Sequence, residues 1–203
     1  MTTSGAAGKV GAMLFNLPNM LTLSRIVAIP LVVACFWLDR GWAQWLSMAL
    51  FVAAAVTDWF DGYFARRYHQ ISRFGRFLDP IADKLLVAAA LVMLVDNSTL
   101  AGLNVLAALI ILAREILVSG LREFLAELRV GLPVSALAKW KTAVQMVAIA
   151  ALLVGDSAAH WVTQAGIVLI WIAAALTLIT GYDYLRTGLR HMAEDTPASG
   201  GPK

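Results

Sequence analysis

Charged residues and cysteine are scarce in this sequence, and both shortages narrow its class. Lys, Arg, Asp and Glu make up only 14% of its 203 residues, whereas 60% are apolar. A soluble domain has about 25% charged and about 45–50% apolar residues, so we expect lipid to cover much of this chain's surface. The single cysteine, Cys35, excludes an intrachain disulfide. The net charge of +3 is too small to favour nucleic-acid binding.

Six apolar segments predict an all-α, polytopic membrane protein with six transmembrane helices. Only helices and closed barrels satisfy their backbone in lipid, and the segments lack the alternation of barrel strands. The third and fifth segments fall short of the roughly 20 residues needed to cross, so we expect each to extend into its polar cytoplasmic flank. The segments cover approximately residues 21–38, 42–64, 81–95, 103–125, 140–154 and 161–185.

The expected organisation is one membrane domain with a short flexible segment at each end. We predict that residues 16–190 form the transmembrane domain, between flexible cytoplasmic ends at 1–15 and 191–203. A short amphipathic helix at the membrane interface is expected just before the first span.

Positive charge is divided very unevenly between the two sets of loops. The loops at 39–41, 96–102 and 155–160 contain only one cation, Arg40, out of 16 Lys and Arg. The termini, the other loops and the adjoining helix ends hold all the rest. The positive-inside rule therefore predicts that both termini and the cation-rich loops are cytoplasmic.

Four carboxylates gather where the second and third segments are joined. Asp58, Asp61, Asp79 and Asp83 fall within 26 residues, and ionisable groups at the edge of a membrane helix are usually functional. At about 100° per residue, Asp58 and Asp61 share one helix face, and Asp79 and Asp83 share another. Close carboxylates repel each other unless cations neutralise them. Mg²⁺ or Mn²⁺ prefers such oxygen ligands, and four acids suffice for two ions in phosphoryl chemistry.

A structural charge network is the alternative for the same stretch. Asp79 precedes Pro80, a pair typical of a helix start, with Asp as the N-cap and Pro in the first turn. Spacing alone leaves both interpretations open. The cations that could pair with the acids are Arg66, Arg67, Arg73, Arg76 and Lys84.

The full pattern around these acids resembles a known enzyme signature. At every fixed position it is similar to that of the CDP-alcohol phosphotransferases: Asp58-x2-Asp61-Gly62-x2-Ala65-Arg66-x8-Gly75-x3-Asp79-x3-Asp83. The resemblance implies a six-helix membrane enzyme, usually a homodimer, in which an alcohol displaces CMP from a CDP-linked donor. It also implies two divalent cations, Mg²⁺ or Mn²⁺, as cofactors.

The resemblance further assigns roles to individual residues. Asp58, Asp61 and Asp79 would be metal ligands, and Asp83 would be the general base and also a metal ligand. For Asn19, Thr22 and Arg25, the alternative is an interfacial amphipathic helix capped around Asn19. The residues expected to contact the CDP moiety are Asn19, Thr22, Arg25, Gly62, Ala65, Arg66, Ser72 and Gly75.

Four cations in the C-terminal half favour an anionic acceptor. Arginine suits a phosphate dianion, and lysine adds a point charge. The alternative is that these side chains simply snorkel to the cytoplasmic interface, with Glu115 and Glu123 neutralising their neighbours. The candidate acceptor-phosphate residues are Arg114, Arg122, Lys139 and Lys141.

Other segments of the sequence narrow the resemblance to one group within the family. From about Asn16 to Gln145 the chain looks like the bacterial phosphatidylglycerophosphate synthases, in strings such as Arg114-Glu115-Ile-Leu-Val-Ser-Gly. This implies transfer of the phosphatidyl group of CDP-diacylglycerol to glycerol 3-phosphate, at the cytoplasmic face of a bacterial inner membrane. Related synthases acting on inositol phosphate or serine are alternatives. A cation transporter is another alternative, although the acids cluster at one edge and mark no route across.

Overall fold

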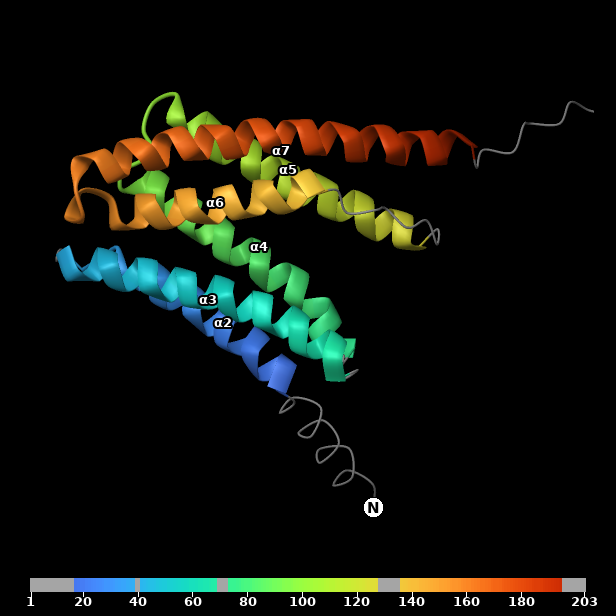
Figure 1. Cartoon of the computed structure of the whole chain (residues 1–203), viewed down its shortest axis with the longest axis horizontal. Coiled ribbons are helices and arrows are strands. Elements are labelled where there is room, and N and C mark those ends of the chain that lie inside the picture. Colours follow the sequence, from blue (N-terminus) through green and yellow to red (C-terminus); the bar gives the residue numbers. More distant parts are fainter. Residues whose placement is uncertain (1–16, 39–40, 69–72, 128–135, 195–203) are drawn as a thin grey trace, which may run out of the picture. The chain divides into compact units, whose positions relative to one another are not determined.

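The computed structural model describes residues 17–38, 41–68, 73–127 and 136–194 (Figure 1). Within these ranges, the side chains of residues 17–19, 58–76, 127, 136, 156 and 189–194 are outside the description. The described chain is helical between its turns and contains no strand, which confirms the predicted all-α class. The helices are α2 (Leu17–Cys35), α3 (Gly41–Tyr68), α4 (Arg73–Asp96), α5 (Asn104–Glu127), α6 (Ala136–Val154) and α7 (His160–Glu194), with a short 3₁₀ turn, η1 (Gly155–Ser157).

Each predicted apolar segment corresponds to one helix. The third and fifth helices do extend into their polar flanks, because α4 begins at Arg73 and α6 at Ala136. Among the described residues, three helical stretches are long and apolar enough to cross a membrane: Asn104–Ala126, Leu137–Val154 and His160–Gly188. Met20–Cys35 and Gly41–Thr57 are shorter apolar helices. Six spans therefore stay a prediction, while three are supported by length and composition.

One expectation about a helix start is wrong. Pro80 lies inside α4, so Asp79 is not its N-cap. Proline removes one backbone N–H, but the helix continues, and the Lys84 ammonium donates a hydrogen bond to the Pro80 carbonyl at 2.8 Å. The short interfacial helix expected just before the first span falls on residues outside the described part of the chain. Helix α2 already includes Asn19, which therefore does not cap it.

The ends of the expected domain differ slightly from the structure. Helix α7 continues to Glu194, past the predicted limit at residue 190. The expected flexible ends, 1–15 and most of 191–203, fall outside the described part of the chain.

The chain divides into two compact units. The first unit comprises the residues up to Leu100 together with Ile149–Gly166. In this unit α2 packs against both α3 and α4, and η1 packs on α3. Its interior is aliphatic and aromatic, which is the usual content of a packed helical core. The fully buried side chains of this unit include Val32, Phe51, Leu86, Leu91, Leu94 and Leu152.

The second unit comprises Ala101–Ala148 and the chain from Ile167 onward. It contains α5, most of α6 and the long C-terminal part of α7. The indole of Trp171 on α7 donates a hydrogen bond to Asn104 at the start of α5, at 3.0 Å. Gly188 allows close packing farther along, since a Cβ there would lie 2.9 Å from a methyl of Leu121.

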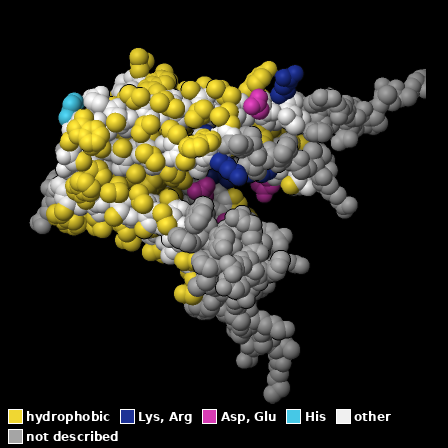
Figure 2. Space-filling view, viewed as in Figure 1, with side chains coloured by type: hydrophobic (Ala, Val, Ile, Leu, Met, Phe, Trp, Pro, Cys, Tyr) yellow, Lys and Arg dark blue, Asp and Glu magenta, His cyan; other side chains and the backbone are white. Residues whose placement is uncertain are grey.

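Large apolar side chains are abundant on the outside of the helices. Leu103, Ile116, Trp37 and Trp161 are each more than 70% exposed. Figure 2 shows hydrophobic side chains over much of the visible face. Apolar patches of this extent are rare on soluble monomers, whereas lipid covers them without cost. The exterior therefore fits a membrane protein.

Gly166 tests the packing of the first unit, with a glycine of α5 as the control. We expect Gly166→Ala to destabilise the protein by about 1–3 kcal/mol, because the new Cβ would lie 2.8 Å from Cγ of the buried Leu152. The matched control is Gly120→Ala on α5, where nothing lies within 4 Å of the new methyl, so stability should rise by up to about 1 kcal/mol. Thermal unfolding in detergent measures both, and equal shifts for the two variants would contradict the packing described.

Candidate active site

The signature residues lie on two helices of the first unit. The backbone places Asp58, Asp61, Gly62, Ala65 and Arg66 near the end of α3. It places Gly75, Asp79 and Asp83 in the first half of α4. Residues three or four apart on a helix share a face, so each pair of acids shares a face as predicted. The side chains of residues 58–76 lie outside the description, as does Ser72 altogether.

Helix α2 brings a polar partner to the signature. The Thr22 hydroxyl donates a hydrogen bond to Oδ1 of Asp79, although 57 residues separate them in the sequence. Thr22 and Arg25, which lie nearly one turn apart, are each only 1% exposed. An interfacial amphipathic helix would turn these polar side chains to water. Their burial contradicts that alternative, and their contact with the CDP moiety stays a prediction.

The two described acids of α4 are suited to metal ligation. Asp79 and Asp83 are both partly buried, one helical turn apart. A carboxylate has about four acceptor positions, so the hydrogen bond from Thr22 leaves most of the capacity of Asp79 open. No three His, Cys, Asp or Glu side chains gather within the described ranges. The side chains of the other two expected ligands, Asp58 and Asp61, lie outside the description, and the carboxylate oxygens of Asp79 and Asp83 fit a divalent cation.

The structure describes the side chain of one cation of the alternative charge network. Lys84, one of its five cations, hydrogen-bonds the Pro80 carbonyl of its own helix. The other four lie in the stretch whose side chains are not described.

The candidate acceptor residues lie in the second unit, where Arg114 occupies a built environment. Its Nη2 donates to the Thr180 hydroxyl at 3.1 Å, and its guanidinium carbon lies 5.7 Å from the centre of the Tyr184 ring. Gly181 allows this approach, since a Cβ there would meet Cγ of Arg114 at 3.0 Å. The buried Nε of Arg114 has no hydrogen-bond partner among the described residues. This guanidinium is thus positioned by α7 and retains a donor.

Arg122 shares the aromatic neighbour of Arg114. Its guanidinium carbon lies 5.6 Å from the centre of the same Tyr184 ring. The two arginines therefore contact one ring from neighbouring stripes of α5, as their spacing of eight residues predicts. Cation–π contacts hold a guanidinium in place without consuming its hydrogen-bond donors.

Lys141 is the most deeply buried of the four candidate cations. It is 2% exposed and forms an ion pair with Glu115, whose carboxylate also lies 3.6 Å from Nη1 of Arg114. Glu115 therefore neutralises neighbouring cations, as the snorkelling alternative supposed, but the burial of Lys141 is incompatible with snorkelling. Lys139 is exposed and matches the snorkelling interpretation better.

Three polar residues in this cluster carry no signal that the sequence analysis recognised. Thr180 and Tyr184 lie on α7, more than 60 residues after their arginine partners. Gln145 follows Lys141 by one turn, is 2% exposed, and its buried Oε1 has no hydrogen-bond partner within the described chain. The i,i+4 spacing of Lys141 and Gln145 on an otherwise apolar helix is the one sequence feature that could have marked the pair.

Comparison with known proteins now decides the family. Residues 15–179 match the family described as CDP-alcohol phosphatidyltransferase. The chain belongs to this family.

Relatives extend the likeness over nearly their whole length, and each carries the name CDP-diacylglycerol–glycerol-3-phosphate 3-phosphatidyltransferase. The Rickettsia bellii protein is 49% identical over 173 residues, which cover 84% of this chain and 94% of the relative. The Salmonella choleraesuis protein is 48% identical over 175 residues, covering 85% and 94%. The Cereibacter sphaeroides protein is 41% identical over 218 aligned positions, covering 89% and 99%. These matches confirm the resemblance inferred from the signature.

The match to the CDP-alcohol phosphatidyltransferases covers both sets of candidate residues. It includes the signature on α3 and α4 and the cations from Arg114 to Lys141. It ends one residue before Thr180, so the side chains of α7 that position Arg114 and Arg122 lie just beyond it. The structure thus adds contacts that the family match does not supply.

The buried pair of Glu115 and Lys141 gives a direct test of the second unit. We expect Glu115→Ala to cost roughly 3 kcal/mol of stability, because it leaves the ammonium of Lys141 buried without its carboxylate. Adding Lys141→Met removes that charge and should restore at least half of the loss. Unfolding of the single and double variants in detergent measures both effects.

The matched control is Glu123→Ala, which removes an exposed carboxylate from the same helix. Its effect should stay within about 0.5 kcal/mol. If Glu115→Ala is no more destabilising than this control, the ion pair does not stabilise the unit.

Proposed function

We propose that this chain transfers the phosphatidyl group of CDP-diacylglycerol to glycerol 3-phosphate, giving phosphatidylglycerophosphate and CMP. The observation that carries the proposal is the relatives' shared name, at 41–49% identity over at least 84% of this chain. The buried cation cluster around Arg114 and Lys141 supports it independently, because it suits an acceptor that bears a phosphate.

The donor would be held at the signature. Asp58, Asp61, Asp79 and Asp83 would bind two divalent cations, Mg²⁺ or Mn²⁺, which when bound neutralise a diphosphate and stabilise charge on departing CMP. Thr22 orients Asp79 through its hydrogen bond, which fixes one ligand before substrate arrives. The residues proposed to contact the CDP moiety remain Asn19, Thr22, Arg25, Gly62, Ala65, Arg66, Ser72 and Gly75.

The acceptor's phosphate would be bound by the cations of the second unit. Arg114 offers its unoccupied Nε, and Tyr184 holds both Arg114 and Arg122 in place. Lys141 adds charge despite its pairing, since one carboxylate, Glu115, serves two cations. Lys139 would contribute at longer range from the exposed side of α6. The amide oxygen of Gln145 could accept a hydrogen bond from an acceptor hydroxyl.

Asp83 is the proposed general base. Its carboxylate would take the proton from the acceptor hydroxyl as that oxygen attacks the phosphorus of the phosphatidyl group. The bond from this phosphorus to the CMP oxygen breaks, and CMP leaves with the electron pair. Asp83 lies one turn beyond Asp79 along α4, on the same face of the helix.

The proposed setting is a bacterial inner membrane. All six helices would span it, with both termini and the signature cytoplasmic, as the uneven distribution of Lys and Arg favours. Three helices already meet the length and composition of a span. A homodimer is proposed from the family resemblance alone.

An acceptor panel tests the proposed reaction. Purified protein with labelled CDP-diacylglycerol should release CMP with glycerol 3-phosphate, and much more slowly with inositol phosphate or serine. In Arg114→Ala the KM for glycerol 3-phosphate should rise about 10- to 100-fold, because charge-assisted hydrogen bonds worth roughly 1.5–3 kcal/mol are lost. The KM for the donor should change much less.

The matched control is Arg186→Ala, which removes an exposed arginine from α7 and should leave both KM values unchanged. Preference for another alcohol would replace glycerol 3-phosphate in the proposal. Metal-ion flux into proteoliposomes without CMP release would favour a cation transporter and reject the enzyme.

Asp83 and the other acids should respond differently to metal. In Asp83→Asn we expect turnover to fall about 10²- to 10⁴-fold while CDP-diacylglycerol still binds, because the base is lost. In Asp79→Asn, and likewise in the variants of Asp58 and Asp61, raised Mg²⁺ or Mn²⁺ should restore part of the rate, because one ligand charge is missing. Turnover and donor binding across a metal titration separate the two roles.

Asp96→Asn is the control on the same helix, since Asp96 is exposed near the end of α4. It should behave as wild type. If excess metal alone returned Asp83→Asn to a near-normal rate, Asp83 would be a ligand and not the base.

A further inference from the structure

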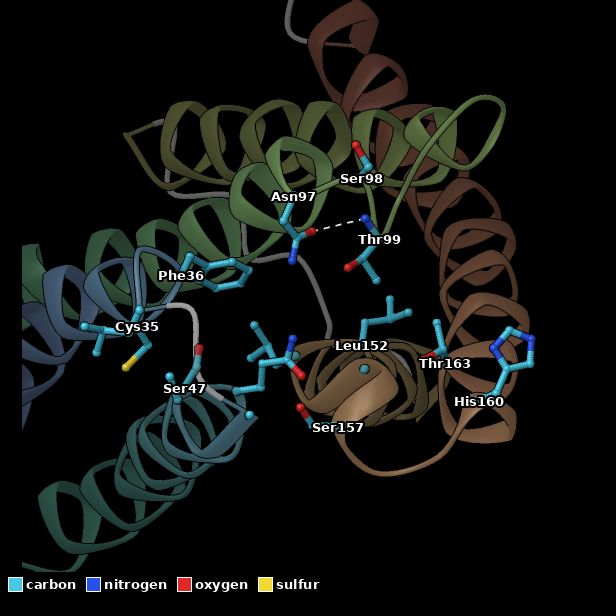
Figure 3. Close-up of a pocket in the computed structure, with 16 residues that line it drawn as sticks. Cys35, Phe36, Ser47, Asn97, Ser98, Thr99, Leu152, Ser157, His160 and Thr163 are labelled. Carbon is cyan, nitrogen blue, oxygen red and sulfur yellow. Dashed lines mark hydrogen bonds between the residues drawn. The ribbon is translucent and has the colours of Figure 1, made fainter.

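A polar cavity of about 620 Å³ lies within the first unit (Figure 3). Binding pockets for small molecules commonly measure about 300–1,000 Å³. Its walls come from the end of α2, the start of α3, the turn after α4, the end of α6 and the start of α7. All of its lining residues belong to the same compact unit. The cavity can therefore be considered on its own.

This cavity is separate from the signature. Ser47 lies 11 residues before Asp58 on α3, and Asn97 lies 14 residues after Asp83 at the far end of α4. A helix rises about 1.5 Å per residue, so the cavity lies roughly 16–21 Å along these helices from the acids. It belongs to the opposite end of the same helices.

The described part of the lining is polar and is built from uncharged residue types and one histidine. Among the described residues that line it, none is Lys, Arg, Asp or Glu. A phosphate, a carboxylate or an ammonium group would therefore lack a counter-charge there. Hydroxyl, amide and imidazole groups act as both donors and acceptors, as a neutral polyol requires. The polar lining residues are Gln44, Ser47, Asn97, Ser98, Thr99, Ser157, His160 and Thr163.

Ser47 is a lining residue whose hydroxyl has no hydrogen-bond partner among the described residues. Its side chain is buried, with 2% exposure, and its hydroxyl makes no hydrogen bond to any described residue. In Figure 3 this hydroxyl points toward the space between the helices. A buried hydroxyl without a partner is costly, and a hydroxyl-bearing ligand would relieve that cost.

Asn97 is oriented by its own turn. Its amide oxygen accepts a hydrogen bond from the backbone N–H of Thr99 at 3.1 Å. The amide nitrogen is then turned toward the cavity in Figure 3, as a donor for a ligand. The aromatic ring of Phe36 also points inward, and an apolar ring face can stack on the C–H face of a sugar.

Exposed tryptophans mark these helix ends as a membrane interface. Trp37, Trp42 and Trp161 are 75%, 53% and 72% exposed. All three lie next to lining residues in the sequence and within the same unit. Tryptophan is enriched at the level of lipid headgroups. A ligand that reaches this cavity from the membrane would therefore present its headgroup.

We propose that this cavity binds a neutral, polyhydroxylated group, namely the sugar headgroup of a glycolipid at the membrane surface opposite the signature. A free sugar has the same chemistry, and the experiment separates the two sources. The site does not depend on the proposed transfer reaction.

The test measures binding to full-length protein in phosphatidylcholine nanodiscs, which avoids sugar-based detergents that would occupy the cavity. The probes are glucosyl-diacylglycerol, diacylglycerol with the same chains, phosphatidylethanolamine and free methyl glucoside. Glucosyl-diacylglycerol should bind at least about ten-fold more tightly than the two lipids without a sugar. Ser47→Ala and Asn97→Leu should each weaken it about five- to ten-fold, the expected loss for one neutral hydrogen bond.

The control variant is Thr187→Val, whose hydroxyl bonds the Asp183 carbonyl of its own helix at 2.9 Å outside the cavity. It should bind the glycolipid as wild type does, and all variants should retain CMP release. Because Ser47→Ala is nearly isosteric, it keeps the test valid if Asn97→Leu fails to fold. Equally tight binding of methyl glucoside would support the polyol site and assign it to free sugars. Equal binding of glucosyl-diacylglycerol and diacylglycerol, or an unchanged affinity in Ser47→Ala, would overturn the proposal.

Discussion

A charged side chain within an apolar helix bundle must be compensated by its neighbours, and the second unit is organised around this requirement. Lys141 is buried and is paired with Glu115, which also lies within reach of Arg114. Arg114 in turn uses a hydroxyl and an aromatic face of α7, and Gly181 makes the room for it. Removing a partner from such a set leaves a charge that lipid cannot solvate. The packing of α5, α6 and α7 and the cation cluster are therefore one arrangement.

The first unit handles its acids in a different way. Helix α4 passes through Pro80 without ending, so Asp79 and Asp83 stay on one face, one turn apart. Had the helix begun at Pro80, an oxygen of Asp79 would have been occupied by a backbone N–H of the first turn. Instead Asp79 accepts a hydrogen bond from Thr22 of α2 and keeps acceptor capacity. Helix α2 thus contacts the signature through Thr22 and does not merely anchor the chain.

The number and class of the helices could be predicted from the sequence, because apolar runs of about 15–25 residues separated by polar turns have few other folds. The helix ends were less accessible. Helix α3 continues to Tyr68, and helix α4 already begins at Arg73. Both helices therefore include charged residues that an apolar run excludes. Spacing alone reveals the four acids and their shared helix faces, whereas the signature is assigned from the family resemblance. Thr180 and Tyr184 could not be found in either way, since their importance comes from contacts with residues far away in the sequence.

The length of α3 accounts for the separation of two kinds of polar chemistry within one unit. Its 28 residues extend about 42 Å at 1.5 Å per residue, close to the roughly 40–45 Å of a bilayer with its headgroup layers. Residues near its start line the polar cavity, and the first acids of the signature lie toward its end. A helix of this length can place one set in each headgroup layer, with the apolar stretch between them. In that arrangement the acids would lie where ions and water are available, and the cavity would lie where headgroups of the opposite surface can reach it.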